Sequence, residues 1–227
     1  MLQRHELLGV SEGTWQAVRN GHPALTSLPA SAGQLVAGWA RNGWPVMVRR
    51  PLPSDAADTI PAALPLPPEH GKLRLAFSLP KAPAPAARAP VLLHDARQAA
   101  PGVWQRTIAS LVHLGEETGS PPRVFGTLLW QRLTGLPYLS SRSDLDLLWV
   151  VSDRQTAAVL LPALRHVEAA APMCLDGEVV LPDGAGVNWR ELADAMDRQG
   201  GDVLVKTMHG IETRPICSLF INSEAER

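Results

Sequence analysis

The sequence predicts an α+β protein in which a small α+β unit (residues 1–85) precedes a larger unit (residues 86–227) built on a mixed sheet flanked by helices. Two observations predict this organisation. Ten of the 21 prolines lie in residues 51–90, and proline fixes φ and removes a backbone donor, so this stretch favours a boundary. Beyond residue 100, apolar segments of period two alternate with segments of helical period, as in a sheet covered by helices.

In the first unit, helical spacing predicts a helix over 32–41 that ends at Asn42-Gly43, followed by a strand over 45–49. A proline-rich loop comes next, and residues 72–79 alternate as a second strand. Residues 80–90 have the composition of a semi-rigid extended connector.

In the second unit the same patterns predict four helices and at least four strands. Asn188 is of the residue type that caps a helix start. The expected helices are 103–114, 128–133, 156–170 and 189–197, and the expected strands are 123–125, 144–151, 173–181 and 203–207, with 216–221 as a possible further strand.

Composition narrows the class of protein. Hydrophobic residues at 45% and charged residues at 19% are typical of an ordered globular chain. A net charge of −1 argues against nucleic acid as the main ligand, because duplex binders carry a basic excess. The sequence has no apolar signal core and no run long enough to span a membrane, and its two cysteines form no metal or disulfide pattern, so we expect a cytoplasmic protein without a membrane partner.

The strand over 144–151 carries two carboxylates. Asp144 and Asp146 are two residues apart and therefore share one face, whereas Leu145 and Leu147 point to the other. Such a pair also occurs on exposed edge strands, but the apolar run that follows is typical of a central strand. Two carboxylates on one face repel unless a cation lies between them, and Mg²⁺ is the hard cation that takes oxygen ligands and bridges to phosphates. Asp144 and Asp146 are therefore the predicted metal ligands.

A glycine turn precedes this strand. Gly126-Thr127 joins a short strand to a helix, where backbone donors and the helix N-terminus can hold a phosphate and the threonine can add a hydroxyl. The plainer interpretation is a tight turn that requires glycine. Arg142 and Ser143, directly before Asp144, are predicted to reach a triphosphate, although Arg142 equally fits a solvated loop.

A third carboxylate commonly completes such a site as a ligand or as a base. Asp176 and Glu178 share one face of the strand over 173–181; we favour Asp176, and either also fits a solvated hairpin. Lys206 stands among apolar residues on the strand over 203–207, where a lysine either pairs with a carboxylate or binds a phosphate. Arg49 and Arg50, an adjacent pair at a strand end, either contact a phosphate or are simply solvated.

The glycine turn, the Asp-x-Asp strand and the following acidic strand resemble the nucleotidyltransferase superfamily. A longer set of segments resembles one family within it, the malonate decarboxylase holo-acyl-carrier-protein synthases, also called phosphoribosyl-dephospho-CoA transferases. The resemblance runs over residues 97–207 and is weaker toward the N-terminus. It is carried by residues 125–138, 143–148, 175–178, 189–191 and 203–207, and by 4–8 and 45–50.

The resemblance implies a nucleotidyltransferase-like fold and an activity that composition cannot predict. The family transfers the phosphoribosyl-dephospho-CoA group of triphosphoribosyl-dephospho-CoA to a serine of the malonate decarboxylase acyl-carrier subunit and releases pyrophosphate. Asp144 and Asp146 match the catalytic aspartate pair of the family. The superfamily usually has Gly-Ser at the turn, so Gly126-Thr127 keeps the hydroxyl and adds a methyl group.

Two alternatives stay open at this stage. One is a nucleotidyltransferase that uses ATP, which would share the turn and the aspartate pair but need not carry the segments at 133–138 and 189–191. The other is a catalytically silent module that binds a carrier or nucleotide. A silent module has no reason to keep a like-charge pair, which favours an enzyme.

Overall fold

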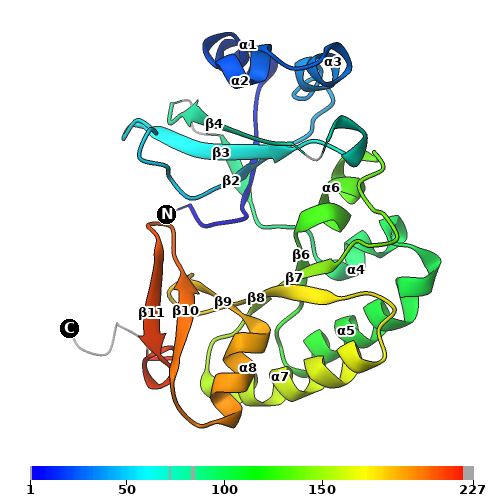
Figure 1. The fold of residues 1–227 in the computed structure, drawn as a ribbon, viewed down its shortest axis with the longest axis vertical. Helices are drawn as coiled ribbons and strands as arrows, with labels where there is room; N and C mark the ends of the chain where they lie inside the picture. Colours follow the sequence, from blue (N-terminus) through cyan, green and yellow to red (C-terminus); the bar gives the residue numbers. More distant parts are fainter. Residues whose placement is uncertain (1, 72, 83–84, 222–227) are drawn as a thin grey trace. The chain divides into compact units, whose positions relative to one another are not determined.

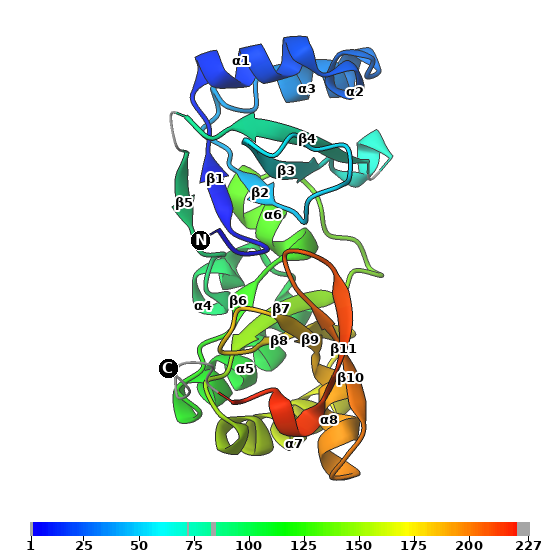
Figure 2. The same cartoon turned by 90° about the vertical axis from the view of Figure 1, so that its left-hand side faces the viewer.

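The computed structural model describes residues 2–71, 73–82 and 85–221. The chain divides into two compact units: Met1–Pro90 with Leu133–Tyr138, and Val91–Arg132 with Leu139–Arg227. The first unit of the structure thus extends to Pro90. The reason is a short strand, β5 (Ala86–Arg88), that pairs with β1 (Leu7–Gly9) and so attaches the predicted connector to the first sheet (Figure 2). Residues 83 and 84 of that connector lie outside the described residues.

The first unit contains an antiparallel sheet with strand order β4-β3-β2-β1-β5 (Figure 2). Trp15 on the first helix packs edge-on against Phe77 of β4, with ring centroids 5.3 Å apart, and both side chains are buried. The other strands are β2 (Val46–Val48), β3 (Thr59–Pro65) and β4 (Arg74–Pro80), and the helices are α1 (Glu12–Gly21), α2 (Pro23–Thr26) and α3 (Ala30–Ala37), with a 3₁₀ turn η1 (Pro68–His70).

Most of the elements expected here are confirmed: the helix as α3, and the two strands as β2 and β4, although Lys72 lies outside the described residues. The prediction of a proline-rich loop without a strand over residues 51–68 was wrong, because this segment contains β3. Two prolines are tolerated within β3 because only Ala62 and Ala63 pair with the three-residue β2. Pro61 faces Arg49, the residue directly after β2: the carbonyl of Pro61 accepts the N–H of Arg49 at 3.1 Å, and the pairing ends there because proline has no N–H to donate in return. Pro65 lies beyond the paired residues on the other side.

The guanidinium of Arg49 is held inside the first unit by groups of its own chain, not by a phosphate. Its terminal nitrogens donate to both carboxylate oxygens of Asp55, at 2.7 and 2.6 Å, and its Nε donates to the carbonyl of Ala62 at 3.1 Å. The Asp55 carboxylate also accepts hydrogen bonds from the backbone N–H of Leu52 and the hydroxyl of Ser78. The hydrogen bonds from Arg49 outweigh burial and hold the pKa of Asp55 far below its ordinary value.

We expect the Asp55→Asn variant to lose about 2–3 kcal/mol of unfolding free energy at pH 7, because the substitution leaves the guanidinium of Arg49 buried without its counter-ion. The pKa of Asp55 is lowered by folding, so its stabilisation is complete above the unfolded-state pKa of about 3.9 and is lost as the pH falls toward the folded-state pKa. Urea unfolding at pH 7 and pH 3 measures this. The gap between wild type and variant should narrow at pH 3, and an equal gap at both values contradicts the assignment. Asp197→Asn, which removes an exposed ion pair, is the control.

The second unit is a six-stranded mixed sheet with strand order β11-β10-β9-β8-β7-β6. Its interior neighbours β7 and β8 are parallel and in register, and every other pair is antiparallel. The strands are β6 (Arg123–Val124), β7 (Leu145–Val150), β8 (Leu175–Val180), β9 (Gly186–Asn188), β10 (Asp202–Lys206) and β11 (Ile211–Pro215).

One face of this sheet forms the core of the second unit. Leu145, Leu147 and Trp149 of β7 are buried on this face, and Figure 1 shows α5, α7 and α8 on one side of the strands. Buried leucines of α5 and α7 and the buried Leu192 of α8 complete the packing. The helices are α4 (Leu93–Ala96), α5 (Gln105–Glu117), α6 (Gly126–Thr134), α7 (Arg154–Ala169) and α8 (Trp189–Asp197), with 3₁₀ turns η2 (Arg97–Ala99), η3 (Gly102–Trp104) and η4 (Ile216–Ser218).

The α+β class with a mixed sheet flanked by helices is confirmed, as are the four expected helices and the strands that became β6, β7, β8 and β10. The further strand over 216–221 was wrong: residues 216–218 form η4, and the edge strand is β11. The pattern misled because β11 is largely exposed and carries no alternation of buried and exposed residues. The three-residue β9 was missed, being too short to show a period.

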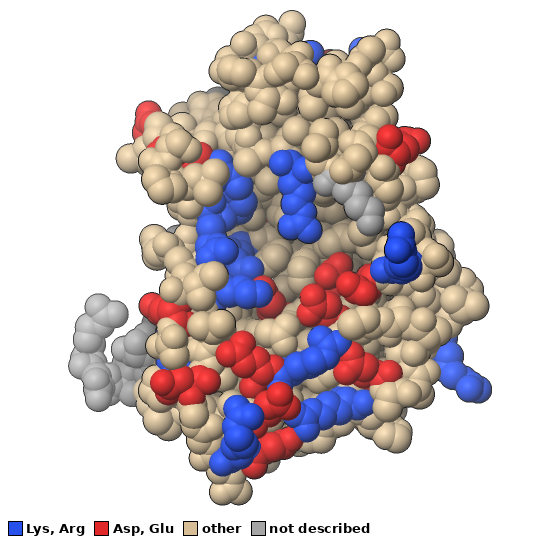
Figure 3. Space-filling view, in the orientation of Figure 1, with Lys and Arg blue, Asp and Glu red and all other residues tan. Residues whose placement is uncertain are grey.

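The surface formed by α7 and α8 carries charges of both signs, which lie side by side in the lower half of Figure 3. Arg165 of α7 pairs with Asp194 and Asp197 of α8, and Arg190 of α8 pairs with Glu168 of α7. These ion pairs therefore join the two helices at two separate places. None of the helices in the described part of the chain has the length and apolar character needed to cross a lipid bilayer.

Candidate active site

The two aspartates lie at the beginning of β7. The strand starts at Leu145, so Asp146 is its second residue and Asp144 directly precedes it. Asp146 is half-buried, and its backbone carbonyl accepts a hydrogen bond from the N–H of Phe125 at 3.1 Å. Asp144 is exposed, and its carboxylate makes no hydrogen bond or ion pair with the described residues. The sheet thus fixes the backbone of Asp146, while the carboxylate of Asp144 is available to a ligand.

Gly126, the first residue of α6, lies directly against the carboxylate of Asp146. A Cβ built on Gly126 would be 1.8 Å from Oδ2 and 2.6 Å from Cγ of Asp146, closer than any real contact. The backbone of Gly126 has φ = +62°, which L-residues with a side chain rarely adopt. The turn therefore requires glycine for two reasons, and it brings the N-terminus of α6, which favours anions, beside the acidic strand.

Thr127 carries an unsatisfied hydroxyl. Its Oγ1 is buried and has no hydrogen-bond partner among the described residues. An unpaired buried hydroxyl costs about 1–3 kcal/mol, so such atoms usually have a partner. At the second residue of α6, a phosphate oxygen of a bound ligand is a partner of fitting chemistry.

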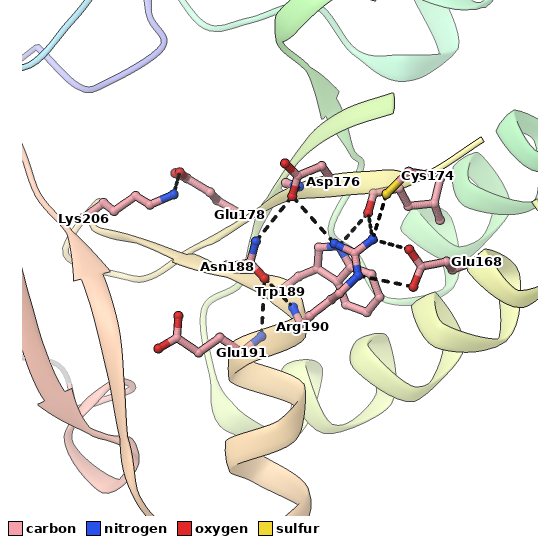
Figure 4. Close-up of polar contacts among 11 residues, drawn as sticks. Glu168, Cys174, Asp176, Glu178, Asn188, Trp189, Arg190, Glu191 and Lys206 are labelled. Carbon is pink, nitrogen blue, oxygen red and sulfur yellow. Dashed lines mark hydrogen bonds and ion pairs between the residues drawn. The ribbon is translucent and has the colours of Figure 1, made fainter. Parts of the chain in front are cut away.

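Asp176 lies next to Asp146 on the neighbouring parallel strand. The register pairs Asp146 with Asp176, so the two side chains project from the same face of the sheet. The Oδ1 atom of Asp176 accepts hydrogen bonds from the N–H of Gly177 at 2.8 Å and from Nδ2 of Asn188 at 3.3 Å, and lies 3.7 Å from Arg190 (Figure 4).

Glu178 has a different environment, although it shares this face. Its side chain is only 6% exposed, and its Oε1 accepts a hydrogen bond from Nζ of Lys206 at 2.8 Å (Figure 4). Of the two possibilities for Lys206, the structure shows the pairing with a carboxylate. Since Glu178 is buried and neutralised, Asp176 is the more accessible of the two acidic residues on β8.

The segment before β7 forms a turn that ends at Asp144. The hydroxyl of Ser143 accepts a hydrogen bond from the N–H of Ser140 at 2.9 Å, and the N–H of Ser143 donates to the carbonyl of Ser140 at 3.1 Å. Arg142 is exposed in this turn, and its guanidinium contacts none of the described residues. Ser143 thus has a structural role, and Arg142 keeps its charge available.

Among the described residues, no three His, Cys, Asp or Glu side chains gather as a ready-made metal site. The available donors are the oxygens of Asp144 and Asp146. This set fits Mg²⁺, which is usually bound through one or two carboxylates while substrate phosphates and waters supply the remaining ligands.

Sequence reasoning missed the residues that surround Asp176, namely Asn188, Arg190 and Glu168. Arg190 lies over the ring of Trp189, 4.7 Å from its centroid, and pairs with Glu168 of α7. Burial lowers the pKa of Arg190, but the hydrogen bond and charge of Glu168 outweigh this effect and raise it overall. Trp189 is 2% exposed and belongs to the core. The Trp-Arg-Glu segment over residues 189–191 was the one sequence feature that pointed to this cluster. Its partners are 14–22 residues away in sequence, so no local pattern could identify them.

A mixed sheet flanked by helices, with a helix that begins at a glycine placed against an aspartate of the parallel strand pair, defines a nucleotidyltransferase-like α+β protein. The family described as phosphoribosyl-dephospho-CoA transferase MdcG matches with its N-terminal domain over residues 3–90 and with its C-terminal domain over residues 91–215. The chain belongs to this family of transferases.

Curated relatives agree over almost the whole length. A phosphoribosyl-dephospho-CoA transferase of Bradyrhizobium diazoefficiens is 36% identical over 210 residues, which cover 92% of this chain and 88% of the relative. Its namesake from Xanthomonas euvesicatoria is 34% identical over 222 residues, which cover 97% of both chains. That from Xanthomonas campestris is 34% identical over 203 residues, covering 89% of this chain and 93% of the relative. No solved structure gives a significant match.

Proposed function

We propose that this enzyme transfers the phosphoribosyl-dephospho-CoA group of triphosphoribosyl-dephospho-CoA to a serine of the malonate decarboxylase acyl-carrier subunit and releases pyrophosphate. The observation that carries the proposal is the contact of Gly126 with the carboxylate of Asp146, which unites an anion-binding helix N-terminus with an acidic strand. The name of the relatives supports the transferred group. The carrier supplies the attacking hydroxyl, which accounts for the lack of a nucleophile motif in this chain.

The transfer is a displacement at phosphorus. The serine oxygen attacks the phosphorus nearest the ribose, a new P–O bond forms, and the bond to the pyrophosphate oxygen breaks. The bonding electrons leave with pyrophosphate, and the serine proton passes to Asp176. Positioning and charge stabilisation supply most of the acceleration in such reactions.

Asp144 and Asp146 are the residues that would hold Mg²⁺. When bound, the ion neutralises charge on the triphosphate and on the departing pyrophosphate. Asp144 suits this role because its carboxylate has no hydrogen bond or ion pair with the described residues. Asp146 suits it because its carboxylate lies beside the N-terminus of α6, whose dipole favours negative charge.

The phosphates themselves are held by the start of α6 and by nearby side chains. The backbone at Gly126 and the unpaired hydroxyl of Thr127 bind the terminal phosphates. Arg142 approaches the triphosphate from the turn that Ser143 stabilises. Lys206, 35% exposed and anchored by Glu178, contributes a positive charge to the same face of the sheet.

Intact mass spectrometry of the apo carrier subunit tests the proposal. With this protein, Mg²⁺ and triphosphoribosyl-dephospho-CoA, we expect a mass gain equal to the prosthetic group, and no gain when EDTA removes the metal. A parallel reaction with ATP should give none. An adenylyl mass gain from ATP alone would replace the proposal by an ATP-dependent transferase. A folded protein that binds the carrier but transfers nothing would identify a silent module.

A further inference from the structure

The carboxylate of Asp176 is held through one oxygen only. Its Oδ1 accepts the N–H of Gly177 at 2.8 Å and Nδ2 of Asn188 at 3.3 Å, and it lies 3.7 Å from a terminal nitrogen of Arg190. Its Oδ2 makes no hydrogen bond or ion pair with the part of the chain that the structure describes. The side chain is 47% exposed, so Oδ2 is open to a ligand.

Asn188 is locked in the orientation that this contact needs. Its Oδ1 caps α8 by accepting the N–H of Arg190 at 3.0 Å and that of Glu191 at 3.4 Å. The amide nitrogen must then point away from the helix, and it points at Asp176 (Figure 4). An amide side chain has an oxygen that accepts and a nitrogen that donates. Because the oxygen of Asn188 caps the helix, the nitrogen is the atom that donates to Asp176.

The guanidinium of Arg190 is fixed from three sides. It pairs with Glu168 of α7, donates to the carbonyl of Leu175 directly before Asp176, and lies 4.7 Å above the ring of Trp189 (Figure 4). A planar guanidinium held in this way offers its remaining nitrogen in a constant direction.

We propose that Asn188 and Arg190 are positioning residues that hold Oδ1 of Asp176, so that Oδ2 is presented to the incoming serine hydroxyl. The inference rests on the proposed function and extends it. The terminal torsion of a free aspartate rotates broadly, and a carboxylate held through one oxygen presents the other in one direction. Proton transfer requires the accepting oxygen within hydrogen-bond reach of the hydroxyl, so this restraint acts on turnover rather than on substrate affinity.

Two substitutions remove the restraint in different ways. Asn188→Ser keeps a good helix-capping residue but lacks the amide donor to Asp176. Arg190→Met removes the guanidinium and its link to Glu168. Arg165→Met is the matched control, because Arg165 likewise joins α7 to α8, through Asp194 and Asp197, and makes no hydrogen bond or ion pair with Asp176.

In the carrier assay we expect Asn188→Ser and Arg190→Met to lower kcat about tenfold to a hundredfold, with the KM for triphosphoribosyl-dephospho-CoA within about twofold of wild type. Arg165→Met should change neither constant, and its thermal stability should fall by less than that of Arg190→Met, because the ion pairs of Arg165 are exposed. Arg190→Lys, which keeps the charge without the planar fork, should recover part of kcat.

Crystal structures of the same variants give a readout independent of activity. The carboxylate of Asp176 should be rotated, or present in two orientations, in Asn188→Ser and Arg190→Met, and unchanged in Arg165→Met. An unchanged carboxylate in the first two variants, or a rotated one with unchanged kcat, overturns the inference. An inactive wild type with an ordered Asp176 overturns the proposed function instead, and with it the catalytic part of this inference.

Discussion

The Asp144→Asn variant is expected to lose transfer by about 100-fold or more while its fold remains intact. Asp144 is exposed, precedes β7, and makes no hydrogen bond or ion pair with the described residues, so the substitution removes a charge and no internal contact. Without bound metal, the variant should be as stable as wild type or slightly more stable, because the repulsion with Asp146 is relieved.

Three measurements check this expectation: carrier modification by mass spectrometry, Mn²⁺ binding by electron paramagnetic resonance, and thermal unfolding in EDTA. Asp202→Asn is the matched control, since Asp202 is also exposed at the beginning of a strand and has no side-chain partner among the described residues. It should behave as wild type in all three. Near-normal turnover by Asp144→Asn would show that Asp144 is not part of the active site. Lost turnover with intact Mn²⁺ binding would show that Asp144 is needed for transfer but is not a metal ligand.

The Gly126→Ala variant is expected to lose both activity and stability. Its Cβ would be 1.8 Å from Oδ2 of Asp146, so the carboxylate or the start of α6 must move. The positive φ adds about 1–2 kcal/mol of strain, and overpacking adds about 1–3 kcal/mol. Because both displaced groups belong to the proposed site, we expect transfer to fall about 100-fold or more.

Gly119→Ala separates strain from contact. Gly119 has nearly the same φ, +65°, but a Cβ there would meet nothing within 4 Å. That variant should show only the strain, about 1–2 kcal/mol, with full activity. In a double-mutant cycle, Asp146→Ala should recover part of the stability lost by Gly126→Ala, because it removes the clashing carboxylate. Purely additive losses in urea unfolding would show that the two residues do not touch.

Several features of the fold followed from local patterns and several did not. The apolar run over 145–151 predicted β7, and helical spacing predicted α5, α7 and α8, because each buries one continuous face. The strand β3 escaped prediction because whether Pro61 is tolerated depends on the short length of its neighbour β2, which is not visible in β3 itself. The role of Arg49 could not be predicted either, because its partners, Asp55 and the carbonyl of Ala62, come close to it only when the loop and the sheet have folded.

The candidate site divides in the same way. Asp144, Asp146, Gly126 and Thr127 were identified as a possible phosphate and metal site from residue type and spacing alone. The period of two could not separate Asp176 from Glu178, because both lie on one face of β8. Their partners distinguish them: Lys206 neutralises Glu178, whereas Asp176 adjoins Asp146 and keeps one oxygen unoccupied by the described residues.

By itself, the sequence determined the class of fold, the family and the acidic strand with its glycine turn, because these depend on residue types at short spacings. Only the tertiary structure decided how those residues are used: the contact between Gly126 and Asp146, the pairing of Lys206 with Glu178, and the hold of Asn188 and Arg190 on Asp176. Each of these joins residues 12 or more positions apart, through strand register or helix packing, and no local pattern encodes the distance between such side chains.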